Sequence, residues 1–427
     1  MRQELERLLD THRAQRPEMQ PQDYYKLLYQ REFGCGHTAP APETAGRHLM
    51  EEYARAAGLP GADAVPEHVK GAALPGCVED IGNGLCRIYL NGSWSREVLR
   101  LLGRVFCATA REHKGETACF AAALDGLAHW ADAVLPPRDA QTLRRQTGTL
   151  RAAGCPAVHH SAAYREQYAP HYRVVRRCYA DAWPALLLAQ RVLESVSPGG
   201  HALLAIDGRC GSGKSTLAAH MAQVFGCPVF HMDDFFLPPE LRTPERLAQP
   251  GENVHHERFL REALEPFAAG QPVRFCPFDC SAGVPGSAVE IPAASFAVVE
   301  GSYSLHPSLR EHYTASVFVT CAQAVQRTRL TARGGADSWA VFEARWIPLE
   351  ETYFKAHAVQ ALADLNFSVE KGESGGRTFT RVIQLDREAR KAELARITGG
   401  SQVTPALLES AGELLDQADA YRKQHFV

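Results

Sequence analysis

The chain has 427 residues, of which 45% are hydrophobic and 22% are charged, a composition that predicts a globular protein with two or three domains. Its formal net charge of −3 excludes a globally basic surface, so we expect no nucleic-acid partner and no attachment to an acidic membrane. The charged N-terminus is unlike a signal peptide, and no apolar run is long enough to cross a bilayer, so we expect a cytoplasmic protein.

The 12 cysteines are spread over the whole chain and form no C-x-x-C pair. Cys276 and Cys280 have the closest spacing, but no second pair is present to complete a zinc site. We therefore expect reduced thiols, most of them buried in apolar segments, rather than a disulfide framework.

Residues 1–196 predict a mainly helical domain of unknown role. The expected helices are 24–33, 45–57, 95–107, 118–134 and 174–196, and loops that contain proline and glycine separate them. The short segment 85–90 has the character of a strand. We identify no well-characterised family in these residues.

Polar residues gather in two places of this domain. They are His37, His159, His160, Tyr164, Arg165, Tyr168, His171, Tyr172 and Arg173. Three interpretations stay open. The histidines could form a metal site with Glu51 or Glu52. The tyrosines and arginines could bind an anionic or planar ligand. The aromatic side chains could simply pack, against the second half of the chain or in the core of this domain, with Pro170 interrupting the helix that begins near Tyr164.

Ser197–Gly200 is rich in turn-forming residues and predicts a linker. After it, short apolar strands alternate with amphipathic helices, which is typical of a parallel sheet. The expected strands are 203–206, 229–231, 296–299 and 317–320, and the expected helices are 214–225, 256–268 and 322–332. Two charged helices, 387–398 and 405–423, are expected to form a C-terminal appendage.

Residues 208–215 match the pattern G-x-x-x-x-G-K-[ST] at every fixed position, between an apolar strand and an amphipathic helix. Gly208, Gly211 and Gly213 let the backbone curl so that its N–H groups converge on a polyphosphate. We expect Lys214 to reach the β- and γ-phosphates and Ser215 to ligate Mg²⁺. The prediction for residues 201–427 is an α/β fold with a parallel sheet of the P-loop NTPase type and flanking helices.

Acidic residues follow two of the expected strands. Asp233 and Asp234 come after residues 229–231, and Glu300 ends the strand at 296–299. Ligands bind at this edge of open α/β sheets, so we expect the carboxylates beside the phosphate loop. One aspartate could accept a proton from a substrate hydroxyl and the other could orient Mg²⁺, as could Glu300 through water. Alternatively, these acids have no role.

Taken together, these segments resemble the uridine kinases and their phosphoribulokinase and pantothenate kinase relatives. The resemblance covers residues 201–370 and rests on segments 208–216, 231–236, 252–259 and 298–301 and a late arginine-rich stretch. It implies ATP-dependent phosphorylation of a small-molecule hydroxyl, with Asp233 as general base. It also implies that Lys214, Ser215 and Thr216 contact phosphate and Mg²⁺ and that Glu300 is the Walker B acid.

The region expected to recognise the acceptor departs from the family pattern. His255, His256 and Glu257 replace the family's Asp-His-Pro, and residues 274–279 match its substrate region only loosely. His255, Glu257 and Asp279 are nevertheless the candidate acceptor-binding residues of these segments. We therefore expect the acceptor to be a nucleoside or another small hydroxyl compound.

The lid arginines would be Arg327, Arg329 and Arg333, and two glycines follow directly. Such arginines can neutralise charge that develops on the transferred phosphoryl group, and we assign that role to Arg333. Arg327 is a candidate acceptor contact. The sequence thus predicts a kinase that uses ATP and Mg²⁺. The alternative is a nucleotide-dependent ATPase that switches the helical domain.

Overall fold

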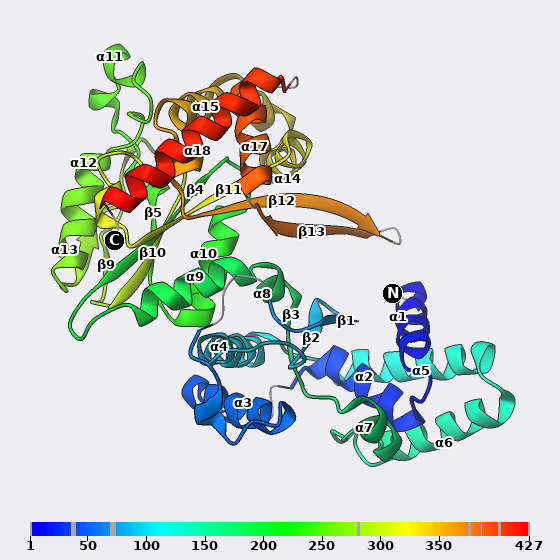
Figure 1. Ribbon diagram of the computed structural model, residues 1–427. Helices are drawn as coiled ribbons and strands as arrows, with labels where there is room; N and C mark the ends of the chain where they lie inside the picture. Colours follow the sequence, from blue (N-terminus) through cyan, green and yellow to red (C-terminus); the bar gives the residue numbers. More distant parts are fainter. Residues whose placement is uncertain are drawn as a thin grey trace. The chain divides into compact units, whose positions relative to one another are not determined.

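The computed structural model describes residues 2–35, 40–68, 74–279, 282–374, 377–385, 387–399 and 403–425. It divides into two compact units, Met1–Trp183 and Pro184–Val427, which Figure 1 shows with separate sets of helices and strands. The division falls after the first residue of helix α9 (Trp183–Glu194), whereas the sequence predicts it at 197–200. Apolar side chains of α9, among them Leu186 and Leu187, are buried, and the helix groups with the second unit. None of the described helices is both long and apolar enough to span a membrane.

The first unit is mainly helical, as predicted, and also contains a small sheet. Its helices are α1 (Arg2–Gln15), α2 (Pro21–Phe33), α3 (Pro42–Ala56), η2 (Ala62–Ala64), α4 (Arg96–Glu112), α5 (Thr117–Val134), α6 (Pro137–Ala152), α7 (Ala162–Tyr168) and α8 (Arg177–Asp181). The antiparallel sheet has the order β1 (Val78–Gly82), β2 (Leu85–Tyr89), β3 (Tyr172–Arg176). The predicted helix 174–196 is wrong at its start, because residues 172–176 pair with β2 and complete its hydrogen bonds.

A buried polar network links this sheet to α2 and to Arg16, which directly follows α1. Arg87, 1% exposed, donates to Glu79 at 3.1 Å and, through Nε and Nη2, to the side-chain oxygen of Gln30. Glu79 also accepts from Tyr89 and pairs with Arg16. Burial opposes ionisation, yet Arg87 and the other cations hold the pKa of Glu79 below its usual range. The buried charges of this core are therefore paired.

The second polar cluster of the first unit is part of the core. His160 contacts Asp23 Oδ1 through Nδ1 at 2.9 Å and the Tyr172 hydroxyl through Nε2 at 2.7 Å, and burial lowers its pKa to about 4. Both ring nitrogens are thus occupied, while His159 is exposed. Glu52 pairs with His171 and Arg173. The proposed metal ligands do not meet among the described residues, and His37 lies outside them.

Tyr164 supports the packing interpretation, because its ring is 1% exposed and stacks on His160 at 4.0 Å. We expect Tyr164→Ala to lower the free energy of unfolding by about 3–5 kcal/mol, as for other buried aromatic residues, and to leave nucleotide affinity unchanged. Thermal unfolding and calorimetric titration measure both. Tyr168→Ala, at a less buried ring of the same helix, should cost less. Altered ligand binding without loss of stability would favour a ligand site instead.

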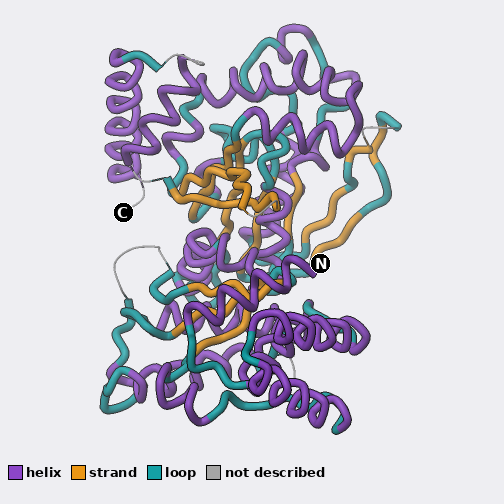
Figure 2. Tube along the Cα trace, turned by 90° about the vertical axis from the view of Figure 1, so that its right-hand side faces the viewer, coloured by secondary structure: helices purple, strands orange, loops and turns teal. Residues whose placement is uncertain are grey.

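The second unit is built on a six-stranded sheet of order β13-β12-β11-β4-β10-β5. The strands are β4 (Ala202–Gly208), β5 (Val229–His231), β10 (Phe296–Glu300), β11 (Ala315–Cys321), β12 (Leu365–Ser374) and β13 (Arg377–Gln384). All neighbours are parallel except β12 and β13. Every residue of β4 and β10 is buried, as in a sheet that helices cover on both faces (Figure 2). The predicted P-loop NTPase type of sheet is confirmed.

Helices of this unit are α10 (Lys214–Phe225), η3 (Met232–Phe235), η4 (Pro239–Leu241), α11 (Pro244–Leu247), α12 (His256–Phe259), α13 (Glu265–Ala268), η6 (Arg310–His312), α14 (Gln323–Val341), α15 (Ile347–Ala356), α16 (Val359–Leu362), α17 (Arg387–Gly399) and α18 (Pro405–His425). A π-helical turn, Leu260–Leu264, joins α12 to α13, since Pro266 has no N–H for the α-helical ladder. A second, Phe342–Trp346, joins α14 to α15. The C-terminal helices α17 and α18 pack on each other around Leu394 and Leu415.

Short strand pairs that the sequence does not predict complete this unit. They are β6 (Val273–Phe275) with β9 (Val289–Ile291) and β7 (Phe278–Asp279) with β8 (Val284–Pro285). The β12–β13 hairpin is also absent from the prediction. The central core includes Phe230, Phe235 and Val299, so it lies beneath the strand ends that carry the candidate site.

Candidate nucleotide-binding and catalytic site

The phosphate loop lies between β4 and α10, as the sequence predicts. Gly208 has φ +137°, and a Cβ there would lie 1.9 Å from the Val319 carbonyl oxygen, so this position requires glycine. Gly213 has φ +107° and directly precedes Lys214, where α10 begins. The N-terminus of α10 therefore faces the loop with its unpaired N–H groups, which is the arrangement that binds phosphate in other proteins.

Lys214 lies folded over the loop. It is 8% exposed, and its Nζ donates to the carbonyl oxygens of Gly208 at 2.8 Å and Arg209 at 3.0 Å and to Ser302 Oγ at 3.2 Å. These contacts hold the ammonium group beside the backbone that would surround a phosphate chain. Lys214 therefore lies at the loop, and its contact with phosphate stays a prediction.

Glu300 lies beside the start of α10. Parallel pairing aligns it with Ile206 of β4 and His231 of β5. Its Oε2 accepts from Ser215 Oγ at 3.2 Å, and its Oε1 lies 2.6 Å from His231 Nδ1, a hydrogen bond that raises the pKa of His231. The hydroxyl and carboxylate oxygens converge, and oxygen donors of this kind suit Mg²⁺.

Asp233 and Asp234 form the short helical turn η3 that follows β5. The side chain of Asp233 keeps exposed surface. Partial desolvation by the surrounding protein nevertheless raises its pKa, and the positive charge of Lys214 opposes this change. Burial also raises the pKa of Asp234. A carboxylate made more basic by its surroundings and still open to a ligand is suited to accept a proton. The structure thus brings both aspartates to the edge that holds Lys214 and Glu300.

The three lid arginines lie on α14, and Arg327 points to a different side of the helix from Arg329 and Arg333. Arg329 Nη1 donates to the carbonyl oxygens of Gly211 and Ser212, at 3.1 and 3.0 Å. Arg333 is exposed and acts electrostatically on Asp233. The guanidinium of Arg327 lies over the Trp339 ring at 5.7 Å, and residues two apart on a helix point to nearly opposite sides.

A pocket of about 550 Å³ in the second unit has Arg258 in its lining, and Arg258 acts electrostatically on Asp234. Its lining residues are Pro238, His255, Arg258, Glu262, Arg274, Phe275, Cys276, Phe278, Pro285 and Ala288. Arg258 connects the pocket to the strand end, because it also acts electrostatically on Asp234 and lies 4.8 Å from the Phe235 ring. The lining combines aromatic and cationic side chains and is large enough for a small metabolite.

Of the candidate acceptor-binding residues, His255 lines this pocket and the others do not. Glu257 pairs with Arg246 at 2.8 Å, and Asp279 Oδ1 accepts from the Ala282 backbone N–H. Arg327 is also absent from the lining, since it packs on Trp339. Arg274 belongs to the segment that was compared with the family's substrate region, whereas no role was predicted for Arg258. Helix α12 brings Arg258 to the pocket and strand β6 brings Arg274.

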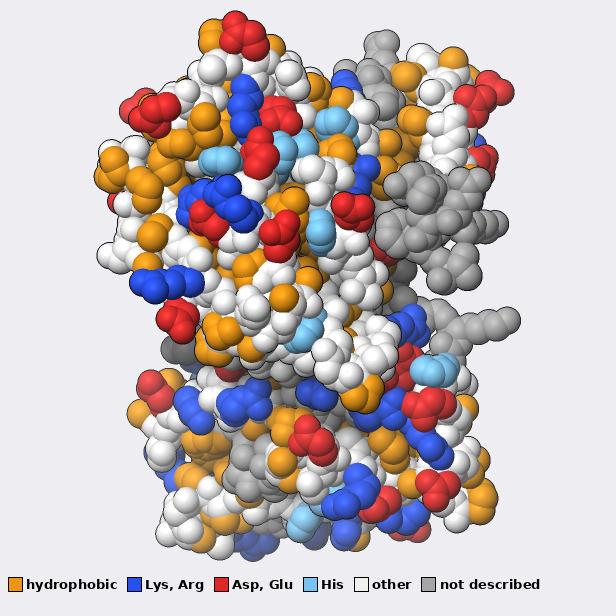
Figure 3. Space-filling view, turned by 90° about the vertical axis from the view of Figure 1, so that its left-hand side faces the viewer, with side chains coloured by type: hydrophobic (Ala, Val, Ile, Leu, Met, Phe, Trp, Pro, Cys, Tyr) orange, Lys and Arg blue, Asp and Glu red, His pale blue; other side chains and the backbone are white. Residues whose placement is uncertain are grey.

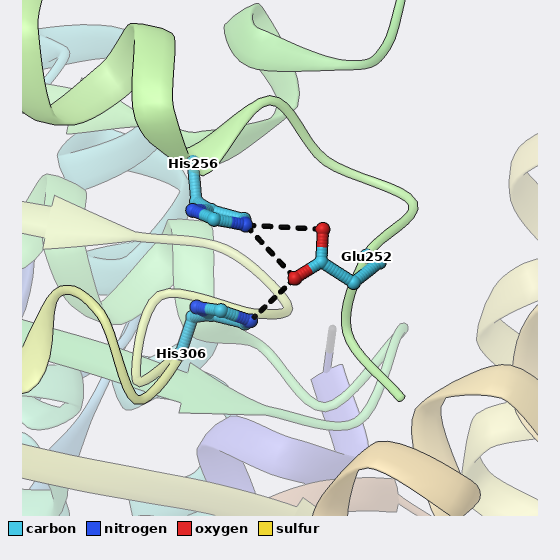
Figure 4. A group of neighbouring side chains, drawn as sticks. All are labelled: Glu252, His256 and His306. Carbon is cyan, nitrogen blue, oxygen red and sulfur yellow. Dashed lines mark hydrogen bonds and ion pairs between the residues drawn. The ribbon is translucent and has the colours of Figure 1, made fainter. Parts of the chain in front are cut away.

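Glu252, His256 and His306 form a compact cluster (Figure 4). Among the described residues, it is the one group of three or more histidine, cysteine, aspartate or glutamate side chains whose ligand atoms all lie within 4.8 Å of one another. Both histidine Nε2 atoms face the carboxylate, at 3.0 and 3.6 Å from Oε1. The Ser308 hydroxyl lies 3.0 and 2.8 Å from their Nδ1 atoms.

The two imidazoles of this cluster are stacked, with centroids 4.1 Å apart and planes 15° from parallel. Their Nε2 lone pairs are consequently almost parallel, and an ion in the plane of one ring would lie outside the plane of the other. Zinc bonds of about 2.0–2.1 Å to both nitrogens would therefore require the rings to turn. We interpret the cluster as a hydrogen-bonded contact between the loop before α12 and the loop after β10.

Asp207 is a buried carboxyl at the end of β4 that sequence reasoning missed. Its oxygens accept from the backbone N–H groups of Gly208 and Leu305 and from the Tyr353 hydroxyl. Burial raises its pKa to about 6, while the backbone hydrogen bonds oppose that change. An acidic residue inside an apolar strand directly before the loop was the available signal. Asp207 anchors the start of the loop to the segment after β10.

The face drawn in Figure 3 carries no single large charged patch among the residues that the structure describes. On the side of the second unit (Pro184–Val427, here called the P-loop unit) that Figure 3 draws, lysine, arginine, acidic and histidine side chains are interspersed. This mixture agrees with the net charge of −3.

No protein-family model matches the chain. Similar solved structures include a possible uridine kinase from Bacillus stearothermophilus, 18% identical, which covers 41% of this chain and 93% of its own with a TM-score of 0.32. They also include a protein from Silicibacter sp. TM1040 designated a fructose transport system kinase, 28% identical over 38% and 92% of the two chains, with a TM-score of 0.31.

Short stretches are similar to the DNA repair protein RecN. The match to RecN of Vibrio cholerae is 51% identical over 47 residues, and that to RecN of Halalkalibacterium halodurans is 39% identical over 67 residues. They cover 11% and 16% of this chain, and the chain spans only 8% and 12% of the length of these relatives.

Proposed function

We propose that the P-loop unit is an ATP-dependent small-molecule kinase of the uridine kinase type. It transfers the γ-phosphoryl group of ATP to a hydroxyl of a nucleoside or another small metabolite. The observation that carries this proposal is the meeting of four groups at one sheet edge: the phosphate loop, Lys214, the Ser215–Glu300 pair and Asp233. Nucleotide binding alone needs no second carboxylate beside an acceptor-sized pocket.

In the proposed reaction the phosphate loop and Lys214 hold the β- and γ-phosphates in place. The acceptor lies in the pocket beside Arg258 and His255 with its hydroxyl toward Asp233. Asp233 accepts the hydroxyl proton as the acceptor oxygen bonds to the γ-phosphorus and the bond to ADP breaks. Arg329, which contacts the loop from α14, and Arg333, which acts electrostatically on Asp233, are the cations available to offset negative charge on the transferred group.

Mg²⁺ fits the oxygen donors of this site. Ser215 and Glu300 already contact each other, and Asp234 lies on the neighbouring turn, so these residues would hold the ion. When bound, Mg²⁺ supplies positive charge to the phosphate oxygens.

A screen for ADP release tests the proposal. The full-length protein is incubated with Mg-ATP and with panels of nucleosides, sugars and vitamins, and Asp233→Asn protein serves as the matched control. We expect ADP formation that depends on one class of acceptor and is lost in the variant. ATP hydrolysis at the same rate with and without every acceptor would instead favour the regulatory ATPase.

A further inference from the structure

A buried carboxylate on α15 contacts the phosphate loop. Glu350 is 4% exposed, and its Oε2 accepts a hydrogen bond from the Cys210 backbone N–H at 3.0 Å. Its Oε1 accepts from the Ser302 hydroxyl at 2.5 Å. A buried carboxylate is costly unless hydrogen bonds and a nearby cation compensate it. The groups that compensate the charge of Glu350 therefore indicate its role.

Ser302 connects Glu350 to Lys214. Its Oγ lies 3.2 Å from Lys214 Nζ, which donates to it. A serine hydroxyl has one hydrogen and two lone pairs, so when the hydrogen points to Glu350, a lone pair can face the ammonium group. The relay from Lys214 through Ser302 to Glu350 thus pairs a buried cation with a buried anion by way of one hydroxyl.

Neighbouring residues of α15 also contact the loop region. Glu351 pairs with the Arg209 side chain at 2.6 Å, and the Tyr353 hydroxyl donates to Asp207. These contacts fix α15 against residues at the end of β4 and the start of the loop. Glu350 differs from them because it reaches the loop backbone and, through Ser302, the lysine that would meet the phosphates.

We propose that Glu350 is a positioning residue of the nucleotide site. It fixes the loop at Cys210 and, through Ser302, determines where the Lys214 ammonium lies before a nucleotide binds. This inference rests on the proposed function only in that the loop binds a nucleoside triphosphate. A site whose donors are already in place loses less conformational freedom on binding, so the loss of Glu350 weakens nucleotide binding.

Calorimetric titration of the full-length protein with Mg-AMP-PNP, which is not hydrolysed, tests this role. We expect Glu350→Ala to raise Kd by about tenfold, the size expected for losing hydrogen bonds to a charged group. Glu350→Gln should stay within about threefold of wild type, because its amide can accept from Cys210 and donate to Ser302 Oγ. Glu343→Ala, at an exposed glutamate between α14 and α15, is the matched control and should change nothing.

A double-mutant cycle separates positioning from general stability. If Glu350 acts mainly through Lys214, Glu350→Ala should raise Kd by about threefold rather than tenfold in a Lys214→Ala background, because only the contact with Cys210 then remains to be lost. Equal losses in both backgrounds would overturn the proposal. So would a lower melting temperature with normal Kd, or a Glu350→Gln protein that binds as weakly as Glu350→Ala.

Three other outcomes separate the failure of this inference from the failure of the proposed function. If Glu350→Ala does not fold, Ser302→Ala carries the test: it must weaken Mg-AMP-PNP binding, and its effect must also shrink in the Lys214→Ala background. If wild-type protein does not bind Mg-AMP-PNP, the nucleotide site itself is wrong and the inference falls with it. If it binds and no acceptor is phosphorylated, the kinase proposal fails while the role of Glu350 stands.

Discussion

Asp233→Asn should bind ATP normally and transfer phosphate poorly. Asparagine has nearly the same shape but cannot accept the hydroxyl proton, so we expect kcat to fall by about 10²-fold or more, the usual scale for a general base. The Kd for Mg-ATP should stay within about threefold of wild type, because the phosphate contacts come from the loop and α10. Single-turnover kinetics with the acceptor found by the screen would measure the chemical step, and calorimetry would measure Kd.

Asp234→Asn is the matched control, one residue along the same turn. Its side chain lies nearer Arg258 and the pocket, so we expect a weaker effect on the chemical step and a clearer effect on Mg²⁺ dependence or acceptor KM. If Asp234→Asn abolishes transfer while Asp233→Asn is harmless, the two carboxylates have been assigned in the wrong order. If neither changes transfer, the general base lies elsewhere.

The sequence predicted the parts of the site that depend on neighbouring residues. The curl of the phosphate loop is determined locally by glycines such as Gly208 and Gly213, and α10 begins at Lys214 as predicted. Asp233 and Glu300 were also predictable. Each follows an apolar strand, and the carboxyl ends of parallel strands share one edge of the sheet.

Residues that reach the site from distant parts of the chain were not predicted. Glu350 lies 140 positions from Cys210, and no spacing rule connects a glutamate on a helix to a loop in another segment. Arg327 was predicted to contact the acceptor. The sequence could not show that its side chain instead lies over the Trp339 ring. In the first unit, Val174–Arg176 read as helix because the hydrogen-bonding edge of β2 is a tertiary feature.

Lys214→Ala should bind Mg-ATP far more weakly than wild type and lose turnover by orders of magnitude, since it removes the cation that meets the β- and γ-phosphates. The ammonium group is held beside the loop by the carbonyl oxygens of Gly208 and Arg209, so its charge lies where the phosphates are expected. The fold should survive, because the lysine serves the ligand site rather than the core. Calorimetry with Mg-AMP-PNP would measure nucleotide affinity, ADP release with the acceptor would measure turnover, and thermal unfolding would measure stability.

Lys355→Ala, at an exposed lysine of α15 in the same unit, is the control for loss of a positive charge and should leave affinity and turnover unchanged. A folded Lys214→Ala protein that still binds Mg-AMP-PNP with wild-type affinity would show that the loop is not the phosphate site. A Lys214→Ala protein that binds normally but does not turn over would place the lysine in the transfer step alone, where the charge on the γ-phosphoryl group develops.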